Sequence, residues 1–197
     1  MKTSAAVVRE GDAPSKRAIL ESALRLFVRD GLCETTIRAV AADAGFTNPA
    51  LFKFFEGRED LARCVFERCY ERLASTVALA AATPGFEPRV RAIVQAATRF
   101  MDEELDAFLF VNEQLRRFWP TVGPSLRRQS IVAILRELFA LGVEEGKIAR
   151  DHDTALLVHA TIGTLSQFAR ALYFEDVAGP AVERAPELER LILRIAW

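Results

Sequence analysis

The sequence predicts an all-α protein. Apolar residues recur at helical spacing along most of the chain, and turn signals rich in glycine and proline separate these stretches. No two alternating apolar runs are joined by a two-residue hairpin turn, so we expect no β-sheet. With 197 residues, 51% of them hydrophobic, the chain can bury the core of one large or two small domains.

The first helix is expected over residues 14–30. Its apolar side chains recur as a broad stripe, which is typical of a helix that packs on a core with one face. Gly31 follows the last periodic residue and can end the helix in a left-handed conformation. The preceding residues, to about Asp12, contain no apolar run, so we expect this tail to be loose and to hold no signal peptide.

Two short helices joined by a turn are expected next. Thr36 can cap the first of them, because its hydroxyl can accept a hydrogen bond from a backbone N–H inside the helix. Gly45 lies where the helix end requires a residue without a side chain. Thr47 can cap the second helix, and Pro49 falls in its first turn, where the missing N–H costs nothing.

The second short helix has an inward and an outward face. Leu51 and Phe55 are four residues apart, so both can face the core. The side chains that remain outside lie near the N-terminus of this helix, where a helix that enters the major groove carries its contact residues. The stretch is therefore predicted to be a helix-turn-helix. These outward residues are Asn48, Pro49, Ala50, Phe52 and Lys53.

The rest of the chain is predicted to form six longer helices. Proline and glycine interrupt the pattern near residues 83–88, 119–124 and 178–180. Together with the first three helices, this gives about nine. The six ranges are about 59–82, 88–104, 106–117, 125–145, 153–174 and 186–196.

The first third of the chain resembles the DNA-binding domain of the TetR family of bacterial transcriptional regulators. The resemblance runs from about Ala13 to Cys69 and comprises the stretches RAILESALRLFVRDG, TTIRAVAADAGF and LFKFF-x-x-RE-x-L. It implies a three-helix head joined through a long fourth helix to a helical ligand-binding and dimerisation body. The expected domains are residues 1–58 and 59–197.

The resemblance also implies which residues contact DNA. The residues expected to contact base edges are Arg38, Asn48, Pro49 and Ala50. Those expected to contact backbone phosphates are Thr36, Thr47, Phe52, Lys53 and Arg58. Phe52 and Phe54 depart from the family, which usually has Tyr at the first position and Tyr or His at the second. A phenylalanine offers a phosphate no polar group. Either Lys53 and Arg58 carry more of that task, or the rings pack on sugars and thymine methyls.

The family pairs its last two helices with those of a second copy, so a homodimer is expected. Two-fold pairing places two recognition helices roughly 34–36 Å apart, and the operator should be a palindrome of double-stranded DNA. Small and branched residues on the predicted eighth helix permit close helix approach, and Gly163 at its centre is most easily explained by tight packing. The expected interface residues are Leu156, Ala160, Gly163, Leu165 and Leu172.

The body is expected to bind a small-molecule effector, because this is the sensor part of the family. Aromatic and polar residues gather between Phe100 and Phe174, as they would around a mostly apolar ligand site. The alternative is that these aromatics are ordinary core residues and that His159 is a hydrogen-bonded core or interface residue. The candidate ligand-binding residues are Phe100, Phe108, Asn112, Gln114, Phe118, Trp119, Phe139, His159 and Phe168.

Composition excludes several classes of protein. No run approaches the ~20 apolar residues that cross a bilayer, so neither a membrane association nor an extracytoplasmic location is expected, and the protein should be cytoplasmic. The net charge is −1, and charge alone would not indicate DNA binding. The three cysteines form no CxxC pair, so they are expected to be buried reduced thiols, with no metal site and no cofactor. Redox sensing by Cys64 and Cys69 is an open alternative.

These observations predict a TetR-like repressor that binds its operator as a dimer and is released by a small hydrophobic or aromatic effector. The alternative is a helix-turn-helix protein without an effector, acting through a protein partner or architecturally. The sequence contains no GxSxG, P-loop, HExxH or glycine-rich dinucleotide turn, so no enzyme is expected.

Overall fold

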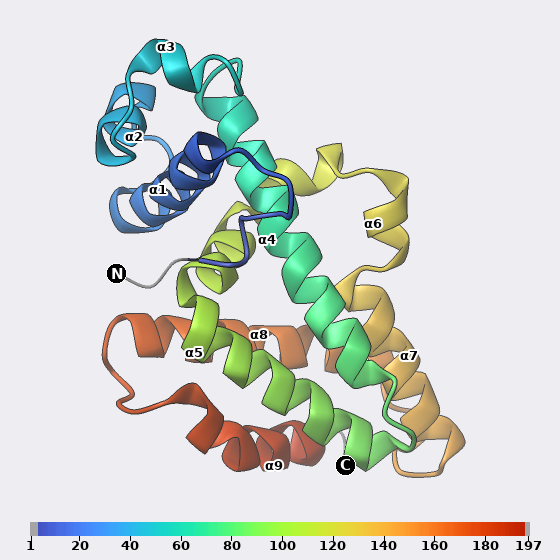
Figure 1. Cartoon of the computed structure of the whole chain (residues 1–197). Coiled ribbons are helices and arrows are strands. Elements are labelled where there is room, and N and C mark those ends of the chain that lie inside the picture. The colour runs from blue at the N-terminus through green and yellow to red at the C-terminus, as the bar shows by residue number, and fades with distance from the viewer. Residues whose placement is uncertain (1–3, 196–197) are drawn as a thin grey trace. The chain divides into compact units, whose positions relative to one another are not determined.

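The chain is all-α in a computed structural model that describes residues 4–195, as the sequence predicts (Figure 1). None of the helices within that range is both long enough and apolar enough to cross a membrane. The elements are α1 (Pro14–Asp30), α2 (Ile37–Asp43), α3 (Asn48–Leu51), α4 (Arg58–Ala81), α5 (Phe86–Phe118), the 3-10 turn η1 (Trp119–Thr121), α6 (Pro124–Arg128), α7 (Ile131–Glu144), α8 (Thr154–Tyr173), η2 (Ala181–Arg184) and α9 (Ala185–Ile195).

The chain divides into two compact units. The head unit contains residues 4–72 and 106–122, and the body unit contains residues 73–105 and 123–195. Helices α4 and α5 each contribute one part to the head unit and one to the body unit. The compact head therefore extends beyond residue 58, the expected end of the DNA-binding domain, because the first part of α4 and the last part of α5 pack with it.

Inside the head unit, α1 packs against α2, and α2 packs against α3. Ile19 and Leu20 on α1 are fully buried, as the apolar stripe predicts. The ring of Phe27 stacks on that of Phe110, with 5.6 Å between their centroids. This contact anchors the last part of α5 against the helix that precedes the helix-turn-helix.

The N-terminal segment corrects a prediction. Residues 1–3 lie outside the described part of the chain, but from residue 4 onward the tail is docked and not loose. Ala6 and Val7 are buried, and the guanidinium of Arg68 on α4 donates from Nη1 to the Val7 carbonyl at 2.8 Å. Arg68 also forms an ion pair with Asp12. The prediction failed because the segment is too short to show a periodic pattern and is held by a distant residue.

The cysteines also differ in part from expectation. None of these three described cysteines is in a disulfide, but Cys33 is exposed, Cys64 is half-buried and only Cys69 is buried. The expectation of three buried thiols was wrong for Cys33 because this residue lies in the turn between α1 and α2.

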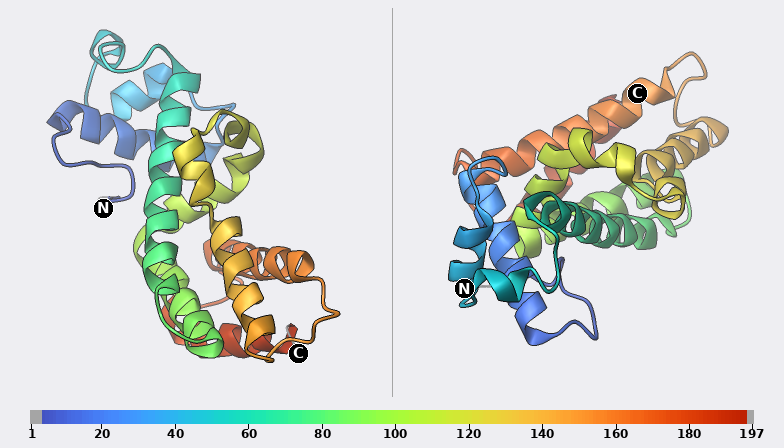
Figure 2. Two further views of the ribbon diagram at one scale, coloured as in Figure 1. Left: turned by 90° about the vertical axis from the view of Figure 1, so that its right-hand side faces the viewer. Right: turned by 90° about the horizontal axis from the view of Figure 1, so that it is seen from above.

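In the body unit, α7 packs against α8, and α8 against α9 (Figures 1 and 2). The rings of Phe86 and Phe139 lie 6.2 Å apart in its core. Gly142 on α7 is also buried, and a Cβ at this position would lie 2.7 Å from Ile148 Cδ1 and 2.9 Å from two ring carbons of Phe86. A side chain at residue 142 would therefore disrupt this part of the core.

Helix boundaries differ from the prediction at two places. The expected helix over 125–145 is divided into α6 and α7, because Ser130 caps α7 and its hydroxyl accepts from the Ala133 N–H at 3.2 Å. The expected helices 88–104 and 106–117 form α5, which has a non-helical residue, Glu104, at the expected break (φ −140°, ψ 44°). The predicted last helix extends to residue 196, which lies outside the described residues.

Candidate nucleic-acid interface

The turn between α2 and α3 is built by short-range contacts. Thr36 caps α2 as predicted, because its hydroxyl accepts from the Ala39 N–H at 3.1 Å. Gly45 has a φ of 76°, and the next residue, Phe46, donates its N–H to the Ala41 carbonyl at 2.8 Å. These bonds end α2 in the left-handed conformation that favours glycine.

The start of α3 differs in one detail. Thr47 occupies the predicted N-cap position, but its side chain makes no capping hydrogen bond. The predicted position is therefore correct and the predicted hydrogen bond is wrong. Pro49 lies in the first turn, where its fixed φ suits the helix. Leu51 and Phe55 are both buried, as the spacing predicts. The short helix is therefore held by its apolar face, and its threonine hydroxyl is not used for capping.

The opposite face projects into solvent. Arg38 from α2 is exposed, as are Thr47, Pro49, Phe52 and Lys53 from the α3 region. Asn48 and Ala50 are half-buried on the same segment, and Thr36 is exposed at the start of α2. The structure thus brings eight of the nine predicted DNA-contacting residues to the outside of the helix-turn-helix, the ninth being Arg58.

Positive charge on this face is available for a ligand. Among the described residues, the side chains of Arg38 and Lys53 form no hydrogen bond or ion pair. Other cations of the head are neutralised: Arg25 pairs with Asp43, and Arg29 pairs with Asp30. A head with balanced charges can therefore present unpaired cations on one face, where phosphate binding requires them.

A model of the family described as "Bacterial regulatory proteins, tetR family" matches residues 19–65, the stretch that contains most of α1 and all of α2 and α3. The chain is a TetR-family transcriptional regulator. Members of this family are DNA-binding regulators and not enzymes, in agreement with the sequence-based prediction.

Solved structures share the fold of this TetR-family regulator over nearly its whole length. The ketosteroid transcriptional regulator KstR2 of Mycobacterium tuberculosis is 17% identical, with 94% of this chain and 95% of that chain covered and a TM-score of 0.78. PfmR from Thermus thermophilus is 24% identical (89% and 97% covered, TM-score 0.73). FadR from Bacillus subtilis, solved in complex with stearoyl-CoA, is 14% identical (89% and 96% covered, TM-score 0.72). At these identities the likeness shows the fold alone.

Arg58 in this TetR-family chain is held by the protein itself. Its Nη1 donates to the Cys33 carbonyl at 2.6 Å and to the Thr35 carbonyl at 3.3 Å. The residue is half-buried and ties the first turn of α4 to the segment between α1 and α2. These contacts favour a structural role for Arg58 over the expected phosphate contact.

Two further contacts hold the beginning of α4. The carboxylate of Glu59 accepts two hydrogen bonds from Arg117, from Nε at 2.9 Å and from Nη2 at 2.6 Å. The hydrogen bonds from Arg117 lower the pKa of Glu59 below its ordinary value. Asp60 accepts from the Glu56 N–H at 3.1 Å. The junction between the helix-turn-helix and α4 is therefore fixed by side chains within the head unit.

The predicted ligand-binding residues are divided between the two units. In the head unit, the rings of Phe118 and Phe66 lie 5.5 Å apart, and those of Trp119 and Tyr70 lie 5.1 Å apart. Phe108 is buried there, and Asn112 donates from Nδ2 to the Phe108 carbonyl at 2.7 Å, while Gln114 is half-buried. In the body unit, Phe100 and Phe139 are buried, Phe168 is half-buried and His159 is exposed. Core packing accounts for most of these aromatics, and His159 is not a core residue of the single chain.

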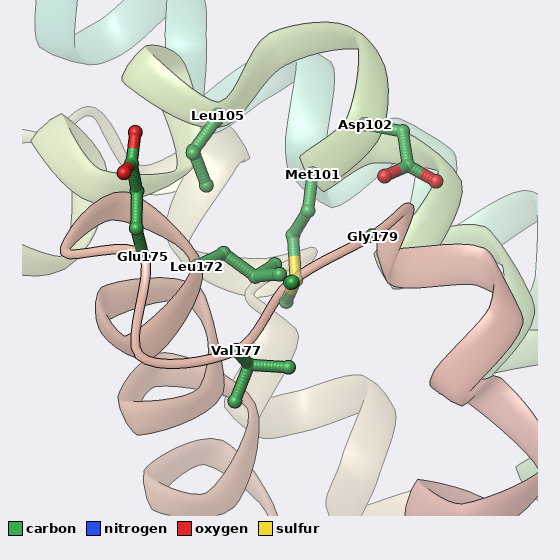
Figure 3. Close-up of a pocket in the computed structure, with 8 residues that line it drawn as sticks. Met101, Asp102, Leu105, Leu172, Glu175, Val177 and Gly179 are labelled. Atoms are coloured by element: carbon green, nitrogen blue, oxygen red, sulfur yellow. The ribbon is translucent and has the colours of Figure 1, made fainter.

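The body unit contains a pocket that the sequence did not indicate. It has a volume of about 530 Å³ and lies where α5, the end of α8 and the following loop meet (Figure 3). The side chains of Met101, Leu105, Leu172 and Val177 give it apolar walls. Asp102, Glu175, Ala178 and Gly179 complete the lining. The sequence showed the chain breaks near residues 105 and 178–180 but not that they lie side by side.

Two polar residues at this pocket have structural tasks. Asp102 caps η2, since its carboxylate accepts from the Ala181 N–H at 2.5 Å and the Val182 N–H at 3.0 Å. Glu175 is the one described non-glycine residue with a positive φ, at 60°. It ends α8 in a position that usually holds glycine, and the Asp176 N–H donates to the Ala171 carbonyl at 2.9 Å beyond it.

The predicted dimer-interface residues fall on two faces of α8. Leu156 is 66% exposed, Gly163 is exposed and Ala160 is half-buried, so these three share an outward face. Leu165 is buried and Leu172 lines the pocket, so both turn inward within the chain. A Cβ on Gly163 would meet no atom within 4 Å, and no packing within the chain explains this glycine.

Sequence reasoning missed other exposed apolar residues of the body unit. Phe174 at the end of α8 is 68% exposed, and Leu191 and Ile195 on α9 are also exposed. These residues add exposed apolar surface at the end of α8 and on the last helix. Their helical spacing is visible in the sequence, but it does not show which face the rest of the chain covers.

Proposed function

We propose that this TetR-family regulator is a cytoplasmic repressor that binds a palindromic operator as a homodimer. In this proposal residues 1–58 contact DNA, and residues 59–197 bind a small effector and dimerise. One observation carries the DNA contact: the face opposite buried Leu51 and Phe55 presents Arg38 and Lys53 without an ion-pair partner among the described residues. Such a face can place Arg38 against base edges and Lys53 against phosphate.

The apolar face of α8 and α9 supports the homodimer. Leu156, Phe174 and Leu191 are large apolar side chains with about half or more of their surface exposed. Exposed large apolar side chains at several positions of two helices are typical of a protein interface. A second copy of the chain would cover it, and Gly163 would permit close approach of the two α8 helices.

The pocket of the body unit supports a hydrophobic effector. Met101, Leu105, Leu172 and Val177 give it an apolar part, beside the carboxylates of Asp102 and Glu175, and its residues come from both the kinked helix α5 and the end of α8. The fold is shared with a regulator whose name refers to ketosteroids and with one whose structure contains stearoyl-CoA; a steroid skeleton and a stearoyl chain are both apolar, which favours an effector with a large apolar part. An effector releases the operator only if it binds more tightly to the state that cannot bind DNA.

The alternative, a DNA-binding protein that responds to a protein partner, shares the head and differs in the body. The packing of Phe118 on Phe66 and of Phe139 on Phe86 favours this alternative, because Phe118 and Phe139 are expected from the sequence to contact a ligand and instead pack on other rings of the protein. A titration separates the two proposals. An effector should weaken operator binding, and the operator should weaken effector binding by the same factor.

The proposal is tested on the full-length protein with an operator selected from random duplexes. Fluorescence anisotropy should show that Arg38→Ala costs about 1–3 kcal/mol of binding free energy and relaxes base preference, with Arg29→Ala as an exposed, ion-paired control. Unchanged affinity and selectivity of Arg38→Ala would reject the base contact. Failure to select any duplex at low salt would reject operator binding itself.

A further inference from the structure

The face that we assign to DNA carries an unusual exposed ring. Phe52 is 54% exposed at the end of α3, although Leu51 beside it is fully buried. The neighbouring Phe54 is half-buried, with its ring centroid 6.4 Å from that of Phe55. Of these three phenylalanines, Phe52 therefore presents the most apolar surface to a ligand.

Phe52 lies among residues with few hydrogen-bonding groups. The side chains of Pro49 and Ala50 can neither donate nor accept a hydrogen bond, and the same is true of the phenylalanine ring. Asn48 supplies the one amide of the segment, and Lys53 supplies the positive charge. The central part of the face can therefore recognise a partner mainly by apolar contact.

The major groove of DNA offers a limited set of apolar groups. Each base edge presents hydrogen-bond donors and acceptors, and the group that adds an apolar contact is the 5-methyl of thymine. Residues such as Ala and Phe match this methyl, and Asn matches adenine in the same base pair through N6 and N7. The composition of the α3 segment thus fits A·T pairs better than G·C pairs, whereas Arg38 on α2 is suited to guanine.

We propose that Phe52 reads the 5-methyl groups of thymines in each operator half-site. This inference rests on the proposed operator binding and makes Phe52 a specificity-determining residue. The affinity then depends on the methyl group itself and not on the hydrogen-bonding edge of thymine. A 5-methylcytosine carries the same methyl, so the two sources of this group must be separated by experiment.

The test replaces thymine by deoxyuridine in the selected operator, symmetrically in both half-sites. Uracil keeps the O4 acceptor and the pairing with adenine and loses only the methyl. At one or two positions per half-site, we expect the Kd to rise about fourfold per methyl removed, or on the order of tenfold for a symmetric pair. Replacing the same T·A pair by 5-methylcytosine·G should retain more affinity than replacing it by C·G.

Two protein variants make the test specific. Phe52→Ala should weaken binding to the thymine operator and show no further loss on the uracil operator, because the two changes remove the same contact. Lys53→Ala, an exposed neighbour, should weaken binding to both operators and keep the full uracil penalty. Both side chains are exposed, and thermal unfolding of the free proteins checks that the head remains folded.

The outcomes separate this inference from the proposed function. If uracil and thymine operators bind equally well, the methyl reading is overturned, operator binding stands, and the ring of Phe52 lies on the sugar–phosphate backbone. If the uracil penalty persists in Phe52→Ala, a different residue reads the methyl and the assignment to Phe52 is overturned. If no duplex is bound, the proposed function fails first.

Discussion

Arg68 and Asp12 form an ion pair that is almost completely buried, with side-chain exposures of 7% and 9%. The Nη2 of Arg68 lies 3.1 Å from Oδ1 of Asp12, and Nη1 donates to Oδ2 as well. The hydrogen bond from Arg68 lowers the pKa of Asp12 from 3.8 to about 2, and the Arg9 N–H contributes in the same direction. This pair joins the N-terminal segment to α4, the helix that leads from the head unit into the body unit.

The ion pair predicts a loss of stability in acid. Because the pKa of Asp12 is lower in the folded state, its contribution to the free energy of unfolding is present above about pH 4. It is lost as the pH falls toward 2, where the carboxylate becomes protonated. Asp12→Asn should lower the free energy of unfolding by about 2 kcal/mol at pH 7 and by less at pH 3. Urea unfolding at several pH values measures this difference.

Asp30→Asn is the matched control for the buried pair. Asp30 also has a lowered pKa, caused by a hydrogen bond from Arg29, but this pair lies at the surface. Its removal should change stability much less, because exposed ion pairs are well solvated. Equal pH profiles for the wild type and Asp12→Asn would show that the N-terminal segment is not held by this pair.

A second prediction concerns the close packing at Gly142. Gly142→Ala should lower the free energy of unfolding by about 1–3 kcal/mol, because its Cβ would lie within 3 Å of Phe86 and Ile148. Gly146→Ala is the comparison. A Cβ at residue 146 would meet open space, so any loss of stability there comes from the φ of 68° and not from overlap with neighbouring atoms. If Gly142→Ala is rescued by Ile148→Val, steric overlap is the cause. Thermal unfolding that is unchanged in Gly142→Ala would contradict the packing described for this site.

The helix-turn-helix could be predicted from the sequence because its signals are local. The Thr36 cap, the left-handed Gly45 and Pro49 in the first turn each act within four residues of their own position. Burial of Leu51 and Phe55 follows from the same spacing. Arg58 shows the limit, since its hydrogen bonds to Cys33 and Thr35 cross 25 and 23 residues and no local pattern indicates them.

The body could be predicted only as a set of helices. Its pocket joins Met101 on α5 to Val177 after α8, two segments whose proximity depends on tertiary packing. Helix α8 carries apolar residues on more than one face, so periodicity could not distinguish outward Leu156 from inward Leu165. Periodicity could not assign the aromatics for a related reason: a ring such as Phe139, which packs on Phe86, has the same helical spacing whether it lines a cavity or fills a core.

A third prediction tests the homodimer. Leu156→Glu places a carboxylate on the outward face of α8, where a second copy would bury it without a partner. The dissociation constant of the dimer should rise at least about tenfold, because burying an unpaired charge costs more than about 1.4 kcal/mol. Leu79→Glu is the control, since Leu79 is 80% exposed on α4 and lies outside this face. Analytical ultracentrifugation over a range of concentrations measures both, and a dimer that is equally stable in Leu156→Glu would exclude this face as the interface.

A fourth prediction concerns the left-handed residue beside the pocket. Glu175→Gly should raise the free energy of unfolding by about 1 kcal/mol, because glycine adopts a φ of 60° without steric cost. Glu175→Ala removes the same charge and keeps the steric cost, so it should not stabilise the protein. Thermal unfolding distinguishes the two. Equal stabilisation by Gly and Ala would mean that the carboxylate, and not the backbone, is the source of the effect.

The last prediction separates the two cations expected at phosphates. The Lys53 side chain makes no hydrogen bond or ion pair within the described part of the chain, so Lys53→Ala should lower the slope of log Kd against log salt by about 1. Arg58 uses its Nη1 on two backbone carbonyls, so Arg58→Ala should destabilise the head by about 1–2 kcal/mol. The salt slope of folded Arg58→Ala should equal that of the wild type. Anisotropy titrations over a series of salt concentrations, at a temperature where both variants are folded, give the slopes. A slope that falls in Arg58→Ala as it does in Lys53→Ala would restore Arg58 to the phosphate contacts, with its carbonyl bonds serving to aim the remaining N–H groups at DNA.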